Sequence, residues 1–266
     1  TARSVISAAE KSNAPIIVNI YKDHLLNHCD SALIAPIIKT LADRAKVSVA
    51  LNLDHGEEKD YILKAIDDGF SSVDASRFDI EGNIKMTCEV VEYAHARGVS
   101  VEGEIGCLGA SEGGAFTQDS MYTDPKQAKE FFERTGIDAL AISIGTSHGN
   151  YPDGMVPKFD IERLKEIKRL TGAPLVLHGG SGSGKENIVN SVKNGINKIN
   201  VGCDFMNANR DAAAKLLSEN PDINYFDLIH STEKESSELV RYYIGPAQRA
   251  KTKTFAEFKR TKLEKN

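Results

Sequence analysis

Three histidines each follow a short apolar segment of the sequence and are each followed directly by a glycine. His55 stands in Leu-Asp-His-Gly, His148 in Gly-Thr-Ser-His-Gly and His178 in Leu-His-Gly-Gly-Ser-Gly. They are too far apart along the chain for a local metal motif, but the ends of separate strands can converge in a barrel. Three neutral imidazoles around an open fourth position suit a catalytic Zn²⁺. The alternative is that these are three unrelated loop histidines.

Two carboxylates also stand at the ends of apolar runs, as the histidines do. Asp54 immediately precedes His55, and adjacent residues at a strand end can point in different directions. Asp54 could therefore face a substrate and exchange a proton with its hydroxyl, or it could cap the following helix. Glu104 ends an apolar run, where an uncompensated carboxylate would be costly. A metal, a histidine partner or a structural salt bridge could compensate it.

Two glycine-rich segments follow strand-like runs. Gly106–Gly114 carries Glu112, and its composition fits a mobile lid that brings a carboxylate to a substrate as well as it fits a plain surface loop. Gly179–Gly184 precedes a helical pattern, and such turns expose backbone N–H groups to an anion. Asn200–Asp204 follows the last strand-like run. Phosphate sites in barrels use the loops after the last two strands, so the sequence predicts a phosphate site here; the alternative is a tight turn required only by connectivity.

The same segment nearly matches a nucleotide-binding P-loop. Gly179–Glu186 reads GGSGSGKE, but Glu186 stands where a magnesium-binding hydroxyl is needed. A carboxylate there would repel a triphosphate, and no obvious Walker-B aspartate follows. A P-loop NTPase therefore remains only a further hypothesis for the function.

A repeated strand–helix pattern must position these residues. Apolar runs rich in Val and Ile predict strands at 15–20, 47–53, 71–73, 99–104, 139–144, 174–178 and 196–201. Amphipathic patterns predict helices at 31–45, 59–68, 83–97, 125–135, 161–170 and 186–193. The strands read as apolar on both faces, as in a parallel sheet covered by helices.

The polar residues at strand ends favour a closed barrel over an open doubly wound sheet. A barrel brings such positions to one rim, whereas the outermost strands of an open sheet are too far apart to cooperate. The predicted fold is an α/β (β/α)₈ TIM barrel whose first strand is apparently missing, because Thr1–Asn13 reads as the helix that should follow it. We also expect residues to be missing before Asp74. We expect a single domain over 1–266 with a C-terminal helical extension from about 233 to 266.

Composition and charge limit the class of protein. The chain is 41% hydrophobic and 27% charged, which argues against a disordered or membrane protein. The formal net charge is −5 without a basic face, which argues against a nucleic-acid partner. Four separated cysteines with no CxxC pair read as free thiols. No run spans a bilayer and no signal-peptide core is present, so we expect a cytoplasmic protein without a membrane partner.

Five motifs, in this order, resemble the class II (metal-dependent) fructose- and tagatose-bisphosphate aldolases: LNLDHG, VEGEIGCLGASEGG, ISIGTSHGNYP, PLVLHGGSG and NKINVGCD. The resemblance runs from near Thr1 to about Asn209 and more loosely to Gly245. It implies a (β/α)₈ barrel, commonly a homodimer or homotetramer, that acts on a small sugar phosphate. It also implies a Zn²⁺ cofactor and allows for a monovalent cation.

The resemblance implies a role for each matching residue. His55, His148 and His178 match the zinc ligands, and Glu104 matches a strand-end glutamate near the metal. Asp54 matches the acid/base that handles the hydroxyl next to the broken bond, and Glu112 a loop glutamate that moves a proton. The implied contacts with dihydroxyacetone phosphate come from the loops after three strands: Gly149, Gly179, Gly180, Ser181, Asn200, Gly202, Cys203 and Asp204.

This chain departs from the family pattern at several positions. Asn52 replaces a histidine that is not among the implied ligands, so zinc binding should survive. Tyr21 stands where a small serine is typical, and its bulk could change which sugar fits. Gly202 and Cys203 replace more usual side chains near the phosphate, and the acidic loop is thinner. These departures suggest a divergent member whose preferred substrate is neither standard bisphosphate.

The sequence thus predicts metal-dependent aldol cleavage or condensation of a ketose (bis)phosphate, giving dihydroxyacetone phosphate and an aldehyde. Zn²⁺ would stabilise the enediolate as a Lewis acid, so no Schiff-base lysine is needed. Lys198 is the nearest candidate for such a lysine. The alternative is a non-catalytic homologue that binds sugar phosphate or stabilises a partner subunit.

Overall fold

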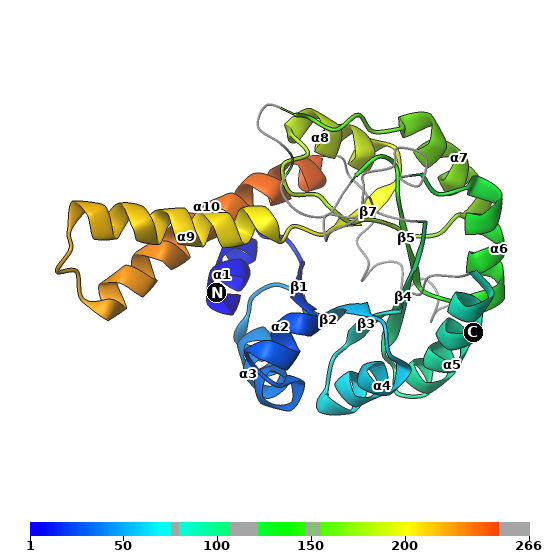
Figure 1. Ribbon diagram of the computed structural model, residues 1–266, viewed down its shortest axis with the longest axis horizontal. Helices are drawn as coiled ribbons and strands as arrows, with labels where there is room; N and C mark the ends of the chain where they lie inside the picture. The colour runs from blue at the N-terminus through cyan, green and yellow to red at the C-terminus, as the bar shows by residue number, and fades with distance from the viewer. Residues whose placement is uncertain (76–79, 107–121, 147–150, 152–154, 250–266) are drawn as a thin grey trace.

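A curled parallel sheet forms the centre of the protein, with helices along its outer side (Figure 1). The computed structural model describes residues 1–75, 80–106, 122–146, 151 and 155–249. Seven strands pair in chain order: β1 (Ile16–Tyr21), β2 (Val49–Gly56), β3 (Ser72–Ala75), β4 (Ser100–Ile105), β5 (Ala139–Ile142), β6 (Leu175–Leu177) and β7 (Ile196–Ile199). All seven predicted strands are present. The prediction of a TIM-barrel fold with seven strands in this chain is confirmed.

The helices alternate with the strands, as the sequence pattern predicts. They are α1 (Ala2–Lys11), α2 (Lys22–Asn27), α3 (Ser31–Arg44), α4 (Lys59–Asp68), α5 (Ile80–His95), α6 (Pro125–Thr135), α7 (Ile161–Thr171), α8 (Lys185–Lys193), α9 (Cys203–Glu219) and α10 (Tyr225–Arg249). Local signals explain the sharp boundaries of α6. The Asp124 side chain accepts hydrogen bonds from the first-turn N–H groups, and Gly136 ends the helix with a φ of 69°.

The two faces of the sheet differ in chemistry. In the parallel ladder Val73 pairs with Val101, and both side chains belong to the main hydrophobic core, together with Phe131 of α6. The next register pair, Asp74 and Glu102, lies on the opposite face, because side chains alternate along a strand. Apolar packing against the helices therefore fills the outer face, while carboxylates enter the inner face.

The prediction that the strands are apolar on both faces is wrong for the inner face. Its buried polar residues include Asn52, Asp74, Glu102 and Lys198, one from each of four strands. Each strand contributes only one or two such positions, so the alternation is too short to stand out against the apolar neighbours. Pairing between strands that are distant in sequence is what makes their burial possible.

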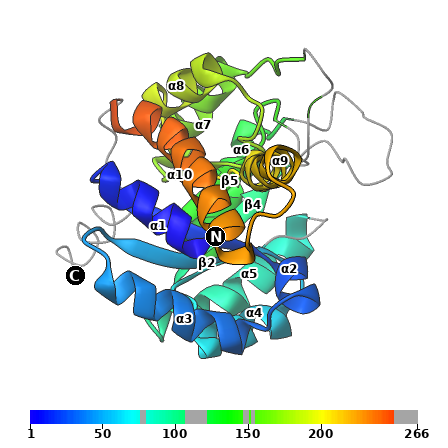
Figure 2. The same ribbon diagram turned by 90° about the vertical axis from the view of Figure 1, so that its left-hand side faces the viewer.

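Two long C-terminal helices complete the fold. α9 and the first part of α10 run side by side and project beyond the rim of the barrel (Figure 1). Figure 2 shows α10 returning between α1 and α8, against which it packs. The predicted C-terminal helical extension begins earlier than expected, at Tyr225, and its residues 250–266 lie outside the described residues. In the described part of the chain, no helix combines the length and apolar character that a bilayer span requires.

Candidate active site

Four potential metal ligands meet at the carboxyl ends of the strands. His55 of β2, Asp74 of β3, Glu104 of β4 and His178 after β6 each offer a ligand atom, and these atoms all lie within 4.8 Å of one another. Glu104 Oε2 lies 3.6 Å from His55 Nδ1 and 3.9 Å from His178 Nδ1. Two donors on one tetrahedral zinc ion would lie roughly 3.3 Å apart, so the observed spacing is close to that of a coordination shell.

The backbone of β2 turns sharply to aim His55 into this cluster. The pairing of β2 with β3 shifts register between Leu53 and Gly56, and His55 has a φ of 53°, which is rare for a residue with a side chain. The His55 N–H donates to Asp74 Oδ2 at 3.1 Å and stabilises this turn. A Cβ at Gly56 would lie 2.6 Å from the Asp74 carbonyl oxygen, so the turn requires glycine here. The irregularity explains how the adjacent Asp54 and His55 can serve different purposes.

His178 is held from behind by a buried ion-pair network. Its Nε2 lies 2.9 Å from Glu102 Oε1, and Lys198 Nζ lies 2.7 Å from the other oxygen of the same carboxylate. All three side chains are buried. Because Glu102 takes up Nε2, the Nδ1 atom is the one directed to Glu104. The network thus fixes which nitrogen of His178 faces the cluster.

The titration behaviour of this network follows from its charges. Burial alone would lower the pKa of His178, but the Glu104 and Glu102 carboxylates outweigh it and raise the pKa to about 10. Burial would likewise lower the pKa of Lys198, yet Glu102 and Asp54 raise it. A Schiff-base lysine must be deprotonated to attack a carbonyl. Lys198 is held as a buried cation instead, which argues against the class I-type role that the sequence left open.

Asp74 supplies a direct test of whether the cluster fits a cation. Among the described residues, its buried Oδ1 atom has no hydrogen-bond partner. Burial and then the neighbouring Glu102 raise the pKa of Asp74 well above its usual range. A buried carboxylate oxygen without a partner is costly, and a divalent cation among two imidazoles and two carboxylates would remove that cost. The residues present therefore fit a metal ion.

Asp54 lies beside the metal cluster, as the sequence predicts. Its Oδ1 accepts a hydrogen bond from Asn200 Nδ2 at 3.0 Å, across the gap between β2 and the end of β7. Burial would raise the pKa of Asp54, but electrostatic interactions with His55, His178 and Lys198 outweigh it and lower the pKa. Asp54 is therefore an ionised carboxylate at neutral pH and able to accept a proton.

The loops after β6 and β7 lie against each other, where the sequence predicts a phosphate site. The Gly180 N–H donates to the Asn200 carbonyl at 3.0 Å, and a Cβ at Gly180 would lie 2.5 Å from the Ile199 side chain. The Asp204 N–H donates to Ser181 Oγ at 3.2 Å. These loops bring seven predicted contacts together: Gly179, Gly180, Ser181, Asn200, Gly202, Cys203 and Asp204. Lys185, the P-loop-like lysine, is exposed at the start of α8.

Three predicted residues, Glu112, His148 and Gly149, lie outside the described residues. Conversely, sequence reasoning assigned no site role to Glu102 or Asp74, and considered Lys198 only as a Schiff-base candidate. The signal for Glu102 is the Val-Glu-Gly-Glu run, in which two carboxylates two residues apart must share a strand face. No local signal reveals that Lys198, from another strand, is its partner.

Two of the departures from the family pattern can be placed. The Tyr21 ring contacts the His55 ring edge-on, with centroids 5.7 Å apart, so it borders the metal cluster. Asn52 is buried, and its amide donates to Asn19 Oδ1 at 2.6 Å. Asn52 therefore takes part in a side-chain pair on the inner face instead of joining the ligand cluster.

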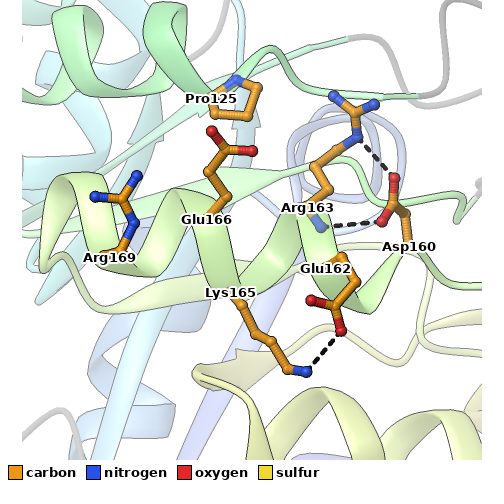
Figure 3. Close-up of a pocket in the computed structure, with 7 residues that line it drawn as sticks. All are labelled: Pro125, Asp160, Glu162, Arg163, Lys165, Glu166 and Arg169. Atoms are coloured by element: carbon orange, nitrogen blue, oxygen red, sulfur yellow. Dashed lines mark hydrogen bonds and ion pairs between the residues drawn. The ribbon is translucent and has the colours of Figure 1, made fainter.

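An open surface depression of about 580 Å³ lies elsewhere, on the outer side of α6 and α7 (Figure 3). Its lining mixes acidic and basic side chains that pair with one another, such as Arg163 with Asp160 and Lys165 with Glu162. None of the residues of the metal cluster lines it. We therefore place the candidate active site at the strand ends and not in this depression.

Comparisons with known proteins show which family the chain belongs to. The family model of class II fructose-bisphosphate aldolase matches residues 1–257. The fructose-bisphosphate aldolase of Geobacillus stearothermophilus is 38% identical over 225 residues, which cover 83% of this chain and 78% of the relative. That of Staphylococcus epidermidis is 35% identical over 252 residues, covering 93% of this chain and 82% of the relative.

A solved structure shows the same architecture. The YdjI aldolase from Escherichia coli K12 superposes with a TM-score of 0.77 at 31% sequence identity, covering 92% of this chain and 86% of that one. The curled parallel sheet, the strand-end cluster and the similarity along nearly the whole chain lead to one assignment. The chain belongs to the class II fructose-bisphosphate aldolases, a family of carbon–carbon lyases.

Proposed function

We propose that this protein is a zinc-dependent aldolase that cleaves a ketose phosphate or bisphosphate into dihydroxyacetone phosphate and an aldehyde, and catalyses the reverse condensation. The observation that carries the proposal is the convergence of His55, His178 and Glu104 beside the ionised Asp54. Such a cluster combines a cation site with a base, which is what cleavage next to a carbonyl requires.

The residues that would hold the zinc ion are His55 and His178, with Glu104 close by and His148 as the third imidazole. When bound there, zinc would supply Lewis-acid stabilisation of the negative charge that develops on the substrate oxygens. Asp74 supports the site by accepting the His55 N–H and by adding negative charge. Glu102 and Lys198 hold the ring of His178.

Asp54 acts as the acid/base in the proposed reaction. In the cleavage direction its carboxylate accepts the proton of the substrate hydroxyl on the carbon next to the breaking bond, and it returns that proton in condensation. The hydrogen bond from Asn200 keeps one oxygen of Asp54 in place for this transfer. Glu112, which follows β4 in the sequence, is proposed to handle the proton on the dihydroxyacetone phosphate carbon.

The phosphate group is proposed to bind at the loops after β6 and β7, with a contribution from Gly149, which follows β5 in the sequence. The backbone N–H groups of Gly179, Ser181 and Cys203 are suitable donors for an anion, whereas those of Gly180 and Asp204 donate within the loops, and α9 directs the positive end of its dipole to this side. Cys203 lacks the hydroxyl typical of the family at its position, so backbone donors carry more of the binding. A monovalent cation could also bind next to the phosphate group, against the phosphate oxygens.

We further propose that the enzyme is a cytoplasmic homodimer or homotetramer. The arm formed by α9 and the first part of α10 supports this, because no side chain of α9 is buried although Met206 and Leu217 are apolar. At the start of α10, Tyr225 and Phe226 are 68% and 81% exposed. Exposed aromatic side chains on a projecting arm are typical of a surface that a second subunit covers.

The test is an aldolase assay over a panel of ketose phosphates, before and after removal of metal. We expect cleavage by the zinc-loaded protein, loss of cleavage with a chelator, and recovery when zinc is added back. Cleavage that survives complete metal removal would contradict the zinc mechanism. A folded, zinc-loaded protein that cleaves none of the panel would favour the non-catalytic sugar-phosphate-binding homologue.

A further inference from the structure

A tyrosine from the C-terminal arm reaches the two loops of the proposed phosphate site. The hydroxyl of Tyr243, on α10, donates to Asp204 Oδ2. The same carboxylate oxygen accepts the N–H of Gly182 at 3.1 Å. Tyr243 also lies 3.5 Å from the carbonyl oxygen of Gly180. One hydroxyl on α10 therefore contacts both the loop after β6 and the start of α9.

Asp204 is the centre of this arrangement. Its side chain accepts from Gly182, while its backbone N–H donates to Ser181 Oγ at 3.2 Å, so it ties the two loops together twice. Gly182 has a φ of 68°, a conformation that few other residues adopt, and its N–H is directed to the Asp204 carboxylate. The direction in which this N–H points thus depends on where the Asp204 carboxylate is held.

We propose that Tyr243 is a positioning residue that holds the Asp204 carboxylate against Gly182 and thereby keeps the Gly180–Gly182 turn in the conformation that receives the substrate phosphate. This rests on the proposed function of the two loops as the phosphate site. A hydrogen bond to the carboxylate also withdraws part of its negative charge, which would otherwise repel the phosphate. The position of α10 is in this way coupled to the affinity of the phosphate site that the two loops form.

The electrostatics support a donor role for the hydroxyl. Burial and the hydrogen bond with Asp204 raise the pKa of Tyr243 above its usual range, so the hydroxyl remains protonated at neutral pH. The docking of α10 has other contacts, because Ile244 packs against Ala9 and Ala14. Removal of the Tyr243 hydroxyl should therefore change the loops without detaching the helix.

The neighbouring tyrosine provides a matched control. Tyr242 lies next to Tyr243 on α10, is 48% exposed and contacts the Tyr243 ring edge-on. Tyr243→Phe and Tyr242→Phe each remove one hydroxyl from the same turn of the same helix. For Tyr243→Phe we expect the KM for the phosphorylated substrate and the Ki for inorganic phosphate to rise about tenfold, as for the loss of one bond to a charged group. The kcat should stay within about threefold.

The control variant should keep the wild-type KM, and zinc content should be the same in all three proteins. Equal KM values for Tyr243→Phe and the wild type, in a protein that cleaves its substrate, would overturn the proposal. A fall in kcat with an unchanged KM would also overturn it, because the effect would then not be on phosphate binding.

A second readout separates this proposal from the proposed function. Hydrogen exchange of a peptide that contains Gly180–Gly184 reports the order of the turn without any ligand. We expect faster exchange in Tyr243→Phe than in Tyr242→Phe, and equal exchange would overturn the positioning role. If the wild-type protein neither cleaves a ketose phosphate nor binds inorganic phosphate, the proposed function fails, and the exchange rates then decide whether Tyr243 orders the turn.

Discussion

The outer and inner faces of the same strands have different roles. On the outer face of β4, Val101 and Ile105 pack into the main hydrophobic core. On the inner face, Glu102 and Glu104 alternate with them and meet His178. The outer face gains stability from burial of apolar surface, whereas the inner face buries charges that only their partners make tolerable. Neighbouring residues in one strand thus serve either stability or chemistry. Substitutions on the outer face should therefore change the free energy of unfolding, and substitutions on the inner face should change zinc binding or turnover.

The largest effect is expected from Asp54→Ala on the inner face. The variant should lose about a thousandfold in cleavage rate, or about 4 kcal/mol of barrier lowering, because the base is gone. Zinc content, measured by elemental analysis, should remain that of the wild type, since the neighbouring ligands are untouched. Asp60→Ala, at an exposed position of α4, is the control. Near-normal turnover of Asp54→Ala would show that the acid/base assignment is wrong.

On the outer face, Phe131→Ala should reduce the free energy of unfolding by about 3 kcal/mol, because it leaves a cavity in a fully buried position. Chemical denaturation measures this loss. Phe132→Ala, next to it and only partly buried, should cost less. Zinc affinity and KM should be unchanged below the melting range. Loss of zinc from Phe131→Ala without loss of stability would contradict the separation of the two faces.

An intermediate effect is expected behind the metal ligands. Glu102→Gln should weaken zinc binding by about ten- to a hundredfold, because the amide no longer orients His178 as the carboxylate does and removes the anion paired with the buried Lys198. Competition with a chromophoric chelator measures the affinity, with Glu133→Gln on the exposed side of α6 as the control. The double variant with Lys198→Met should recover folding stability but not zinc affinity. Wild-type zinc affinity in Glu102→Gln would refute the orienting role.

The smallest effect is expected from a substitution at Gly103, which tests most sharply whether the two faces are independent. Gly103 lies between Glu102 and Glu104, and a Cβ at this position would lie 2.8 Å from Phe131 Cε1 and 3.0 Å from Ile137 Cδ1. Gly103→Ala should therefore cost about 1 kcal/mol of stability through crowding of the outer face. Zinc affinity should stay at the wild-type value. A change in zinc affinity with unchanged stability would mean that the strand transmits the disturbance to the inner face.

The sequence predicts the strand–helix framework well, because the pattern of each element is local. The helix α6 begins at the cap and ends at the glycine that the sequence predicts, and α4 ends at Gly69 as predicted. The helix α9 is missed because its apolar residues, Met206 and Leu217 among them, do not gather on a buried face: none of its side chains is buried. The early start of α10 is missed for a related reason, since Tyr225 and Phe226 are exposed.

The candidate site likewise contains some residues that the sequence predicts and others that it does not. Asp54, His55, Glu104 and His178 can be found because each stands at the end of an apolar run. The pairing of Glu102 with Lys198 cannot, because residues 96 positions apart are brought together only by the curl of the sheet. The same is true of Tyr243 and Asp204, which meet through the return of α10 to the barrel. Sequence shows which strand ends carry chemistry, while non-local packing decides what holds them in place.

The convergence of the strand-end histidines on one cation is the claim from which the proposed function follows. Anomalous X-ray diffraction from crystals of the zinc-loaded protein, collected on both sides of the zinc absorption edge, tests it most directly. The account predicts one strong zinc peak within bonding distance of nitrogen atoms of both His55 and His178, next to Glu104. A peak bound to other residues, or ordered His55 and His178 rings with no zinc between them at full zinc loading, would contradict it.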